Sequence, residues 1–304
     1  MTIPNFTKEH ADQILAHVKV EAIRARKFKV AVDMINASAC VMDPYLFEQL
    51  GVELIPINNI PNGQFAHRPE PLRENLSEVM KIAKELKADL GFVHDPDADR
   101  LVMIDEKGEV VSEEYSLAFG VENILSKNPG QPIVINLSTS QMSADLAKKY
   151  GSEYFRSKIG EGYVVKEMLA RNAIIGGEGG GGVIYPAINT VRDSFTTLSL
   201  VLELLAERKQ TVSQCIATLP KYFMKKDKWP IGGKNLNEIY SKLKLHFKDI
   251  KTDEQDGLRL DLPDSSWLHL RPSNTEPIIR LFGEAKTQER IDALFVEAKL
   301  TLGL

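Results

Sequence analysis

The chain has 304 residues, of which 43% are hydrophobic and 26% charged, and its formal net charge is −4. This length allows two or three domains with buried cores, and the acidic balance argues against a partner that is nucleic acid or an anionic membrane. No run reaches the roughly 18 apolar residues of a membrane span. Two distant cysteines and an N-terminus without an apolar signal segment favour a reducing cytoplasm.

Predicted helices and strands alternate from residue 5 to residue 112. Apolar spacing predicts helices at 6–18 and 75–87 and buried strands at 28–34 and 52–57. Two more strands flank an aspartate-rich loop. This alternation predicts an α/β layer structure with mostly parallel strands.

The same alternation restarts near residue 113 and includes a long helix at 193–210, for which Asp193 is the expected N-cap. A proline- and lysine-rich segment, 220–233, is the expected linker. Beyond it, helices enclose a group of strands that includes a hairpin at 258–272. Strands grouped in this way predict a small α+β domain.

Three aspartates, Asp95, Asp97 and Asp99, stand at alternate positions before Arg100. Like charges this close raise each other's pKa unless a cation shares the site, and carboxylate oxygens suit Mg²⁺ or Ca²⁺. An EF-hand loop, with Glu106 at its twelfth position, is disfavoured because Arg100 stands where that loop needs glycine. A magnesium site is the favoured interpretation, and an acidic surface turn is the alternative.

The second candidate site is the glycine-rich segment 176–182, which reads GGEGGGG. It matches G-x-G-x-x-G from Gly177, but a strand-like VIYP follows where a dinucleotide-binding loop needs a helix. We expect a loop whose backbone closely approaches a ligand, with Glu178 accepting hydrogen bonds from vicinal hydroxyls. A flexible surface loop is the alternative.

The third candidate site is the segment 271–277, which reads RPSNTEP. Arg271, Ser273, Asn274 and Thr275 offer a guanidinium, two hydroxyls and an amide within five residues, which is the chemistry of a phosphate cradle. An ordinary polar turn is the alternative. Together the three sites indicate a phosphorylated, hydroxyl-rich ligand handled with Mg²⁺.

The motifs DPDADR, GGEGGGG and RPSNTEP, in this order and at these intervals, resemble those of the α-D-phosphohexomutase superfamily. Its members are phosphoglucomutases, phosphomannomutases and phosphoglucosamine mutases. The resemblance covers nearly the whole chain and involves the family's second, third and fourth domains. It implies two tandem α/β/α three-layer domains with mixed sheets, followed by a small α+β C-terminal domain. The expected domains are residues 1–112, 113–222 and 223–304.

The resemblance also implies a role for each candidate residue. The three aspartates would hold Mg²⁺, and Arg100 would help at the transferring phosphate. Glu178 and Gly180 would lie at the sugar, and Lys158 falls where many members have an active-site basic residue. The phosphate that does not react, on a hexose phosphate substrate, would be held by Arg271, Ser273, Asn274 and Thr275.

Two departures from the family pattern qualify this expectation. The phosphoserine nucleophile belongs to a first domain with a T-A-S-H-N-type loop, which nothing here matches, so we expect this chain alone to be inactive or very weak. Gly180 and Gly182 also replace a serine and a histidine found in many members. A second hypothesis is a non-catalytic sugar-phosphate-binding or interaction subunit, completed by another chain. Loss of a packed domain would also expose an interface, which favours self-association. A phosphatase with an aspartyl nucleophile is disfavoured, because His94 precedes Asp95 where such enzymes have apolar residues.

Overall fold

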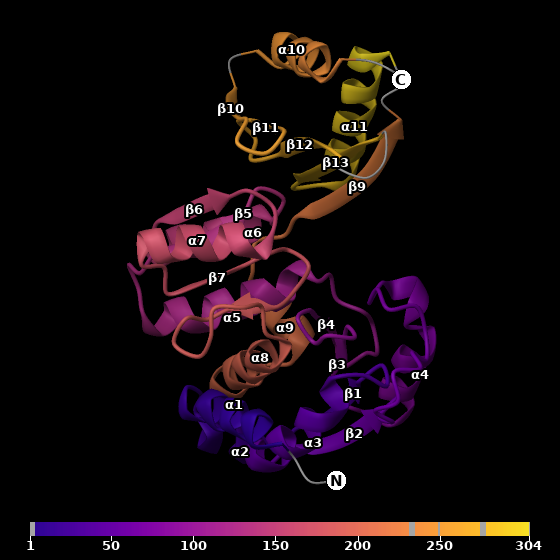
Figure 1. Ribbon diagram of the computed structural model, residues 1–304, viewed down its shortest axis with the longest axis vertical. Helices are drawn as coiled ribbons and strands as arrows, with labels where there is room; N and C mark the ends of the chain where they lie inside the picture. Colours follow the sequence, from indigo (N-terminus) through magenta and orange to yellow (C-terminus); the bar gives the residue numbers. More distant parts are fainter. Residues whose placement is uncertain (1–3, 231–234, 249, 274–277, 304) are drawn as a thin grey trace.

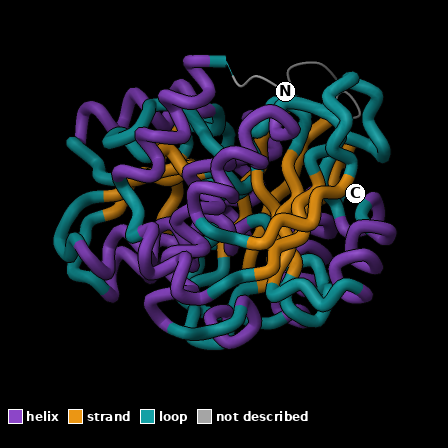
Figure 2. Tube along the Cα trace, turned by 90° about the horizontal axis from the view of Figure 1, so that it is seen from below, coloured by secondary structure: helices purple, strands orange, loops and turns teal. Residues whose placement is uncertain are grey.

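The computed structural model describes residues 4–230, 235–248, 250–273 and 278–303. The chain forms three units in sequence order, each built on one β-sheet (Figure 1). Seen from below, helices flank the strands on several sides (Figure 2). Within the described residues, no helix is long and apolar enough to cross a bilayer.

The first unit is a four-stranded sheet with helices on both faces. Its elements are α1 (Asn5–Ala16), α2 (Val20–Arg26), β1 (Lys29–Asp33), α3 (Ala39–Leu50), β2 (Glu53–Ile57), η1 (Arg73–Asn75), α4 (Ser77–Glu85), β3 (Leu90–His94) and β4 (Leu101–Ile104). The strand order is β2-β1-β3-β4, with β4 antiparallel to its neighbour and the rest parallel. Val30 and Val32 face α1, α2 and α3, whereas Ala31 faces α4, so β1 is apolar on both sides.

The second unit repeats this topology. Its elements are α5 (Glu114–Lys127), β5 (Ile133–Asn136), α6 (Gln141–Lys149), β6 (Tyr154–Ser157), α7 (Glu161–Arg171), β7 (Ile175–Gly177), β8 (Val183–Ile184), α8 (Ser194–Arg208) and α9 (Val212–Ile216). The order is β6-β5-β7-β8, again with the last strand antiparallel. Asp193 caps α8 by accepting a hydrogen bond from the backbone N–H of Phe195, as predicted.

The third unit is an antiparallel sheet covered by two helices on one face. Its elements are β9 (Phe223–Pro230), α10 (Leu236–His246), β10 (Lys251–Asp253), β11 (Leu258–Asp261), β12 (Trp267–Pro272), β13 (Ile278–Ala285) and α11 (Gln288–Leu302). The strand order is β10-β11-β12-β13-β9. These three sheets confirm the predicted fold of two tandem α/β units followed by an α+β unit.

The expected linker at 220–233 is wrong for residues 223–230, which form β9 and pair with β13 along eight residues. The lysines that suggested a linker mark an edge strand, whose charged side chains discourage pairing with another sheet. The strand is anchored by Trp229, which is buried in the core of the third unit.

One hydrophobic core runs through the first two units. Buried residues of α1, α2 and α3 belong to the same cluster as those of α5, α6 and α8. The third unit has a separate core beneath α10 and α11. Figure 1 shows α8 beside α1, although nearly 200 residues of chain separate them.

Candidate active site

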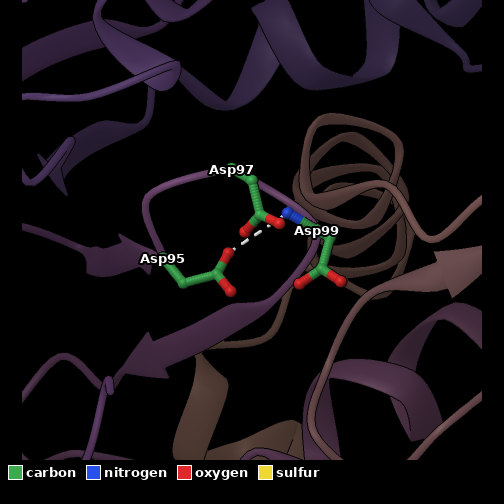
Figure 3. A group of neighbouring side chains, drawn as sticks. All are labelled: Asp95, Asp97 and Asp99. Atoms are coloured by element: carbon green, nitrogen blue, oxygen red, sulfur yellow. Dashed lines mark hydrogen bonds between the residues drawn. The ribbon is translucent and has the colours of Figure 1, made fainter. Parts of the chain in front are cut away.

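The aspartate loop connects β3 to β4 and folds around the carboxylate of Asp95. Asp95 Oδ1 accepts hydrogen bonds from the backbone N–H groups of Asp99 (3.1 Å) and Arg100 (3.0 Å), and its Oδ2 accepts one from Arg100 Nε (2.7 Å). Burial opposes ionisation of Asp95, but the hydrogen bonds from Arg100 prevail and lower the pKa of this carboxyl. Figure 3 shows the carboxylates of Asp95, Asp97 and Asp99 grouped on this one loop.

The donor set of this loop fits a small divalent cation. One carboxylate oxygen from each of the three aspartates lies within 4.8 Å of the others. An octahedral Mg²⁺ site places ligand oxygens about 3 to 4 Å apart, so small side-chain rotations suffice. Asp99 Oδ1 is buried without a hydrogen-bond partner among the described residues. Burial raises the pKa of Asp99 to about 7, with Arg192 opposing this shift and Asp95 adding to it.

The glycine loop between β7 and β8 packs directly on the aspartate loop. A Cβ atom at Gly182 would lie 2.0 Å from the carbonyl oxygen of Asp99, and one at Gly181 would lie 2.4 Å from that of Leu101. Both glycines have φ near +82°, which disfavours other residues. The sequence led us to expect a close backbone approach toward a ligand, but at these two glycines the backbone approaches the aspartate loop.

Glu178 is buried where β7 enters this loop. Its Oε1 accepts hydrogen bonds from Asn136 Nδ2 (2.7 Å) and from the backbone N–H of Gly160 (2.7 Å). Its Oε2 lies 3.3 Å from Arg192 Nη1. These contacts fix the orientation of a carboxylate that faces the same cavity as the aspartates.

The third unit contributes positively charged side chains to the site. Arg271 on β12 stands directly opposite Arg280 on β13, and Arg271 Nε donates to Asp256 Oδ1 (3.0 Å). Facing like charges destabilise a sheet unless an anion or a counter-charge is near. Lys226 on β9 donates to Glu113 Oε1 (2.6 Å) at the boundary with the second unit.

These groups line one cavity of about 470 Å³ that all three units enclose. The lining residues are Asp95, Asp97, Asp99, Arg100, Glu113, Glu114, Asn136, Ser138, Ile159, Glu178, Gly179, Gly180, Arg192, Lys226, Arg271, Arg280 and Phe282. The structure thus brings together the three aspartates, Arg100, Glu178, Gly180 and Arg271.

Two other predicted residues, Lys158 and Ser273, are not among the residues that line this cavity. Lys158 is exposed, and its ammonium lies 5.7 Å from the centre of the Tyr163 ring and outside the lining of the cavity. The backbone N–H of Ser273 donates to the carbonyl of Ile278 (2.9 Å). The remaining two, Asn274 and Thr275, lie outside the described residues.

Several lining residues were not predicted. Asn136 is the last residue of β5 and Ser138 follows it, at the carboxyl end of the strand where ligands of parallel sheets commonly bind. The predicted strand could therefore have pointed to both residues. Glu114 begins α5, and burial raises the pKa of its carboxyl well above the usual range. The sequence next to Arg192 and Arg280 contains no motif that would mark them as site residues. They reach the cavity only because segments distant in sequence fold together.

Three models of one family match the chain in order. They describe phosphoglucomutase/phosphomannomutase α/β/α domain II at residues 8–108, α/β/α domain III at 113–223 and the C-terminal domain at 227–300. The fold is that of the second, third and C-terminal domains of the phosphohexomutase family. The chain belongs to the phosphoglucomutase/phosphomannomutase family.

Individual proteins agree with this assignment. The chain is 37% identical over 285 residues to a phosphoglucomutase/phosphomannomutase of Thermococcus kodakarensis, covering 93% of this chain and 62% of the relative. It is 31% identical over 299 residues to a probable phosphoglucosamine mutase of Pyrococcus abyssi, covering 97% and 65%. The chain therefore spans less than two thirds of the length of these curated relatives.

Solved structures show the same fold. A phosphoglucomutase/phosphomannomutase family protein of Burkholderia thailandensis matches with a TM-score of 0.83 and 28% identity, over 97% of this chain and 64% of that one. Aspergillus fumigatus N-acetylphosphoglucosamine mutase, solved with GlcNAc-6P and magnesium, matches with a TM-score of 0.64 and 14% identity, over 97% and 68%. The second match supports the fold alone.

Proposed function

We propose that this chain carries the cation, sugar and phosphate sites of a phosphohexomutase. Such an enzyme interconverts the 1- and 6-phosphates of a hexose through a phosphoserine and a bisphosphate intermediate. The observation that carries the proposal is the single cavity lined by Asp95, Glu178 and Arg271, one from each of the three units. The same cavity is lined by three aspartates and by a pair of arginines, Arg271 and Arg280, which offer separate sites for a cation and for a second phosphate.

The proposed roles follow from the contacts. The three aspartates would hold Mg²⁺. A bound Mg²⁺ ion would neutralise negative charge on the phosphoryl group that is transferred. Arg100 is held beside them by Asp95 and can donate to the same phosphate. Glu178 would accept hydrogen bonds from sugar hydroxyls, and Arg271 would hold the second phosphate together with Ser273, Asn274 and Thr275. A role for Lys158 stays a prediction.

The nucleophile is proposed to come from a further domain, on the same polypeptide or on another chain. Two findings support this: no segment here resembles a T-A-S-H-N-type loop, and the matched models are the second, third and C-terminal domains of the family. The chain alone should then bind hexose phosphates and Mg²⁺ but turn over weakly or not at all. A cytoplasmic location is the matching expectation.

A second candidate function is a sugar-phosphate-binding or interaction subunit without catalysis of its own. The glycines at 180 and 182 favour it, because neither places a side chain in the sugar loop where many family members have one. In this case a partner chain would complete the site.

The test measures binding and turnover on the same sample. Calorimetry with glucose 1-phosphate, mannose 1-phosphate and glucosamine 6-phosphate, each with Mg²⁺, should show binding of at least one. Coupled assays should show no robust interconversion until a protein with the phosphoserine domain is added. Robust turnover by the chain alone would refute the missing nucleophile, and no binding of any hexose phosphate would refute both candidate functions.

A further inference from the structure

Arg192 occupies a junction between three segments of the site. It lies immediately before the N-cap of α8, and its side chain is only 18% exposed. Its Nη2 donates to Asp99 Oδ2, its Nη1 lies 3.3 Å from Glu178 Oε2, and its Nε lies 3.3 Å from Glu161 Oε2. One guanidinium therefore contacts the aspartate loop, the glycine loop and the first residue of α7.

The chemistry of arginine makes this junction rigid. A guanidinium carries its N–H donors in a fixed planar fork, so its contacts with three carboxylates constrain one another. The main chain is also held, because the backbone N–H of Arg192 donates to Glu161 Oε2 (3.1 Å). A change at one of the three carboxylates is thereby transmitted to the other two.

Arg192 also serves as the positive charge nearest to Asp99. The neighbouring cation, Arg100, is engaged with Asp95 at 2.7 Å and is 3.5 Å from Asp99 Oδ1. A divalent cation held by the three aspartates would approach the same Asp99 carboxylate that Arg192 contacts. The guanidinium and the cation are then competitors for Asp99, and they repel each other.

We propose, building on the proposed function, that Arg192 is a positioning residue that couples the cation site to the sugar loop. Its guanidinium neutralises Asp99 when no divalent cation is bound, and it releases Asp99 when one binds. Nη1 and Nε stay with Glu178 and Glu161, and the released Nη2 becomes free to donate into the cavity, where a phosphorylated sugar carries negative charge. Cation binding thus makes a guanidinium donor available to the phosphorylated sugar.

The proposed coupling and a purely structural role of Arg192 predict opposite changes in Mg²⁺ affinity when Arg192 is replaced. If Arg192 competes with the cation, its removal tightens Mg²⁺ binding. If it only holds Asp99 in place, its removal weakens Mg²⁺ binding. Calorimetric titration of wild type and Arg192→Met with MgCl₂ should therefore show about tenfold tighter binding for the variant, a change typical of coupled sites.

A matched control is Arg171→Met, which removes an exposed arginine paired with Glu167 on α7. It should leave Mg²⁺ affinity unchanged. Thermal melts identify a variant that fails to fold, and Arg192→Lys then replaces it, because lysine keeps the charge without the planar fork. This second variant should bind Mg²⁺ with an affinity at or above that of wild type.

A spectroscopic signature completes the test. The side-chain Nε–Hε resonance of Arg192, assigned from its loss in the Arg192→Lys spectrum, should shift as Mg²⁺ is added to wild type. An unshifted resonance, or variants that bind Mg²⁺ more weakly than wild type, would overturn the inference and leave the proposed function standing. Failure of wild type and variants alike to bind Mg²⁺ would refute the cation site, and the inference with it.

Discussion

At the scale of single residues, the glycine-rich loop is explained by contact between two backbones. Gly181 and Gly182 lie against the carbonyl groups of Leu101 and Asp99, at a φ that only glycine adopts readily. The loop reads like a ligand-binding motif in sequence. In the structure, Gly181 and Gly182 allow the glycine loop and the aspartate loop to come into backbone contact.

The importance of this backbone contact can be tested by comparing alanine substitutions at two glycines that have the same φ but different surroundings. Gly182→Ala should lower the free energy of unfolding by about 3 kcal/mol or more and weaken Mg²⁺ binding, because the new Cβ would displace Asp99. Gly130 has the same φ of +82°, but a Cβ there would meet nothing within 4 Å. Gly130→Ala should therefore cost only about 1 to 2 kcal/mol. Equal losses in chemical denaturation would contradict the packing argument.

A second prediction concerns the facing arginines of the third unit. Arg271→Gln should weaken hexose phosphate binding by about 2 kcal/mol, the scale of hydrogen bonds to charged groups, while Mg²⁺ affinity stays unchanged. Calorimetry with each ligand separately measures both. Arg290→Gln, which removes an arginine paired with Asp264 on the surface, serves as the control. Equal weakening by both variants would mean that Arg271 acts only through overall charge.

Site residues that fall within short motifs could be predicted from sequence. Asp95, Glu178 and Arg271 each stand in a segment whose composition already indicates its chemistry. Arg192 could not be predicted in this way, because its partners lie 14 to 93 residues away. Lys158 shows the converse: its position in a motif suggested a site, but the fold leaves its ammonium outside the cavity lining.

At the scale of secondary-structure elements, the buried strands were the most predictable. Strands with both faces covered, such as β1 and β5, read as continuous apolar runs. The strand β9 was not predicted, because its charged residues lie on an edge and its pairing with β13 is not visible in local sequence. Pairing between distant segments is decided by the whole sheet.

The loop that follows β2 is fastened to β1 by one histidine. His67 Nε2 lies 2.7 Å from Asp33 Oδ2, and the same carboxylate accepts hydrogen bonds from Asn58 Nδ2 (2.9 Å) and the backbone N–H of Ile35 (3.0 Å). The hydrogen bond with Asp33 raises the pKa of His67 above its usual 6.5, although burial opposes the shift.

This contact predicts a stability difference that depends on pH. Because the folded pKa of His67 is raised, its contribution is complete below about pH 6.5 and is lost as pH rises through the folded value. The difference in unfolding free energy between wild type and His67→Gln should therefore shrink as the pH rises above about 6.5 and through the raised folded pKa. His17→Gln, whose ring bonds a main-chain carbonyl, controls for loss of an imidazole. A difference that grows with pH would contradict the ion pair.

At the scale of the whole molecule, the three units do not correspond to three independent cores. The first two units share one apolar cluster, which joins α1 and α2 to α5 and α8. The third unit has a core of its own, and its contacts with the second are mainly polar, such as Gln141 N–H to Glu284 Oε2 (2.7 Å). The sequence predicted two domain boundaries and did not distinguish the shared core from the separate one, because periodicity shows which face of an element is apolar and not what covers it.

The separate core of the third unit should allow that unit to unfold before the first two. Both tryptophans, Trp229 and Trp267, lie in the third unit, so tryptophan fluorescence reports on that unit alone. In denaturant, the fluorescence transition should precede the loss of far-UV circular dichroism, because the third unit is smaller and buries less surface. Hydrogen exchange read by mass spectrometry should place the early opening in residues 223–303. Coincident transitions would show that the polar interface couples all three units.

The shared core also decides how the cavity can change shape. The aspartate loop and the glycine loop both stand on the fused first two units, whereas Arg271 and Arg280 stand on the third. Relative motion is thus confined to one interface, with contacts such as Ile159 N–H to Asp256 Oδ2 (3.0 Å). The distance between the aspartate loop and the two arginines is therefore set by this one interface. Under the proposed function, substitutions at the interface should change the rates at which a sugar phosphate enters and leaves, with the affinity for Mg²⁺ unaffected.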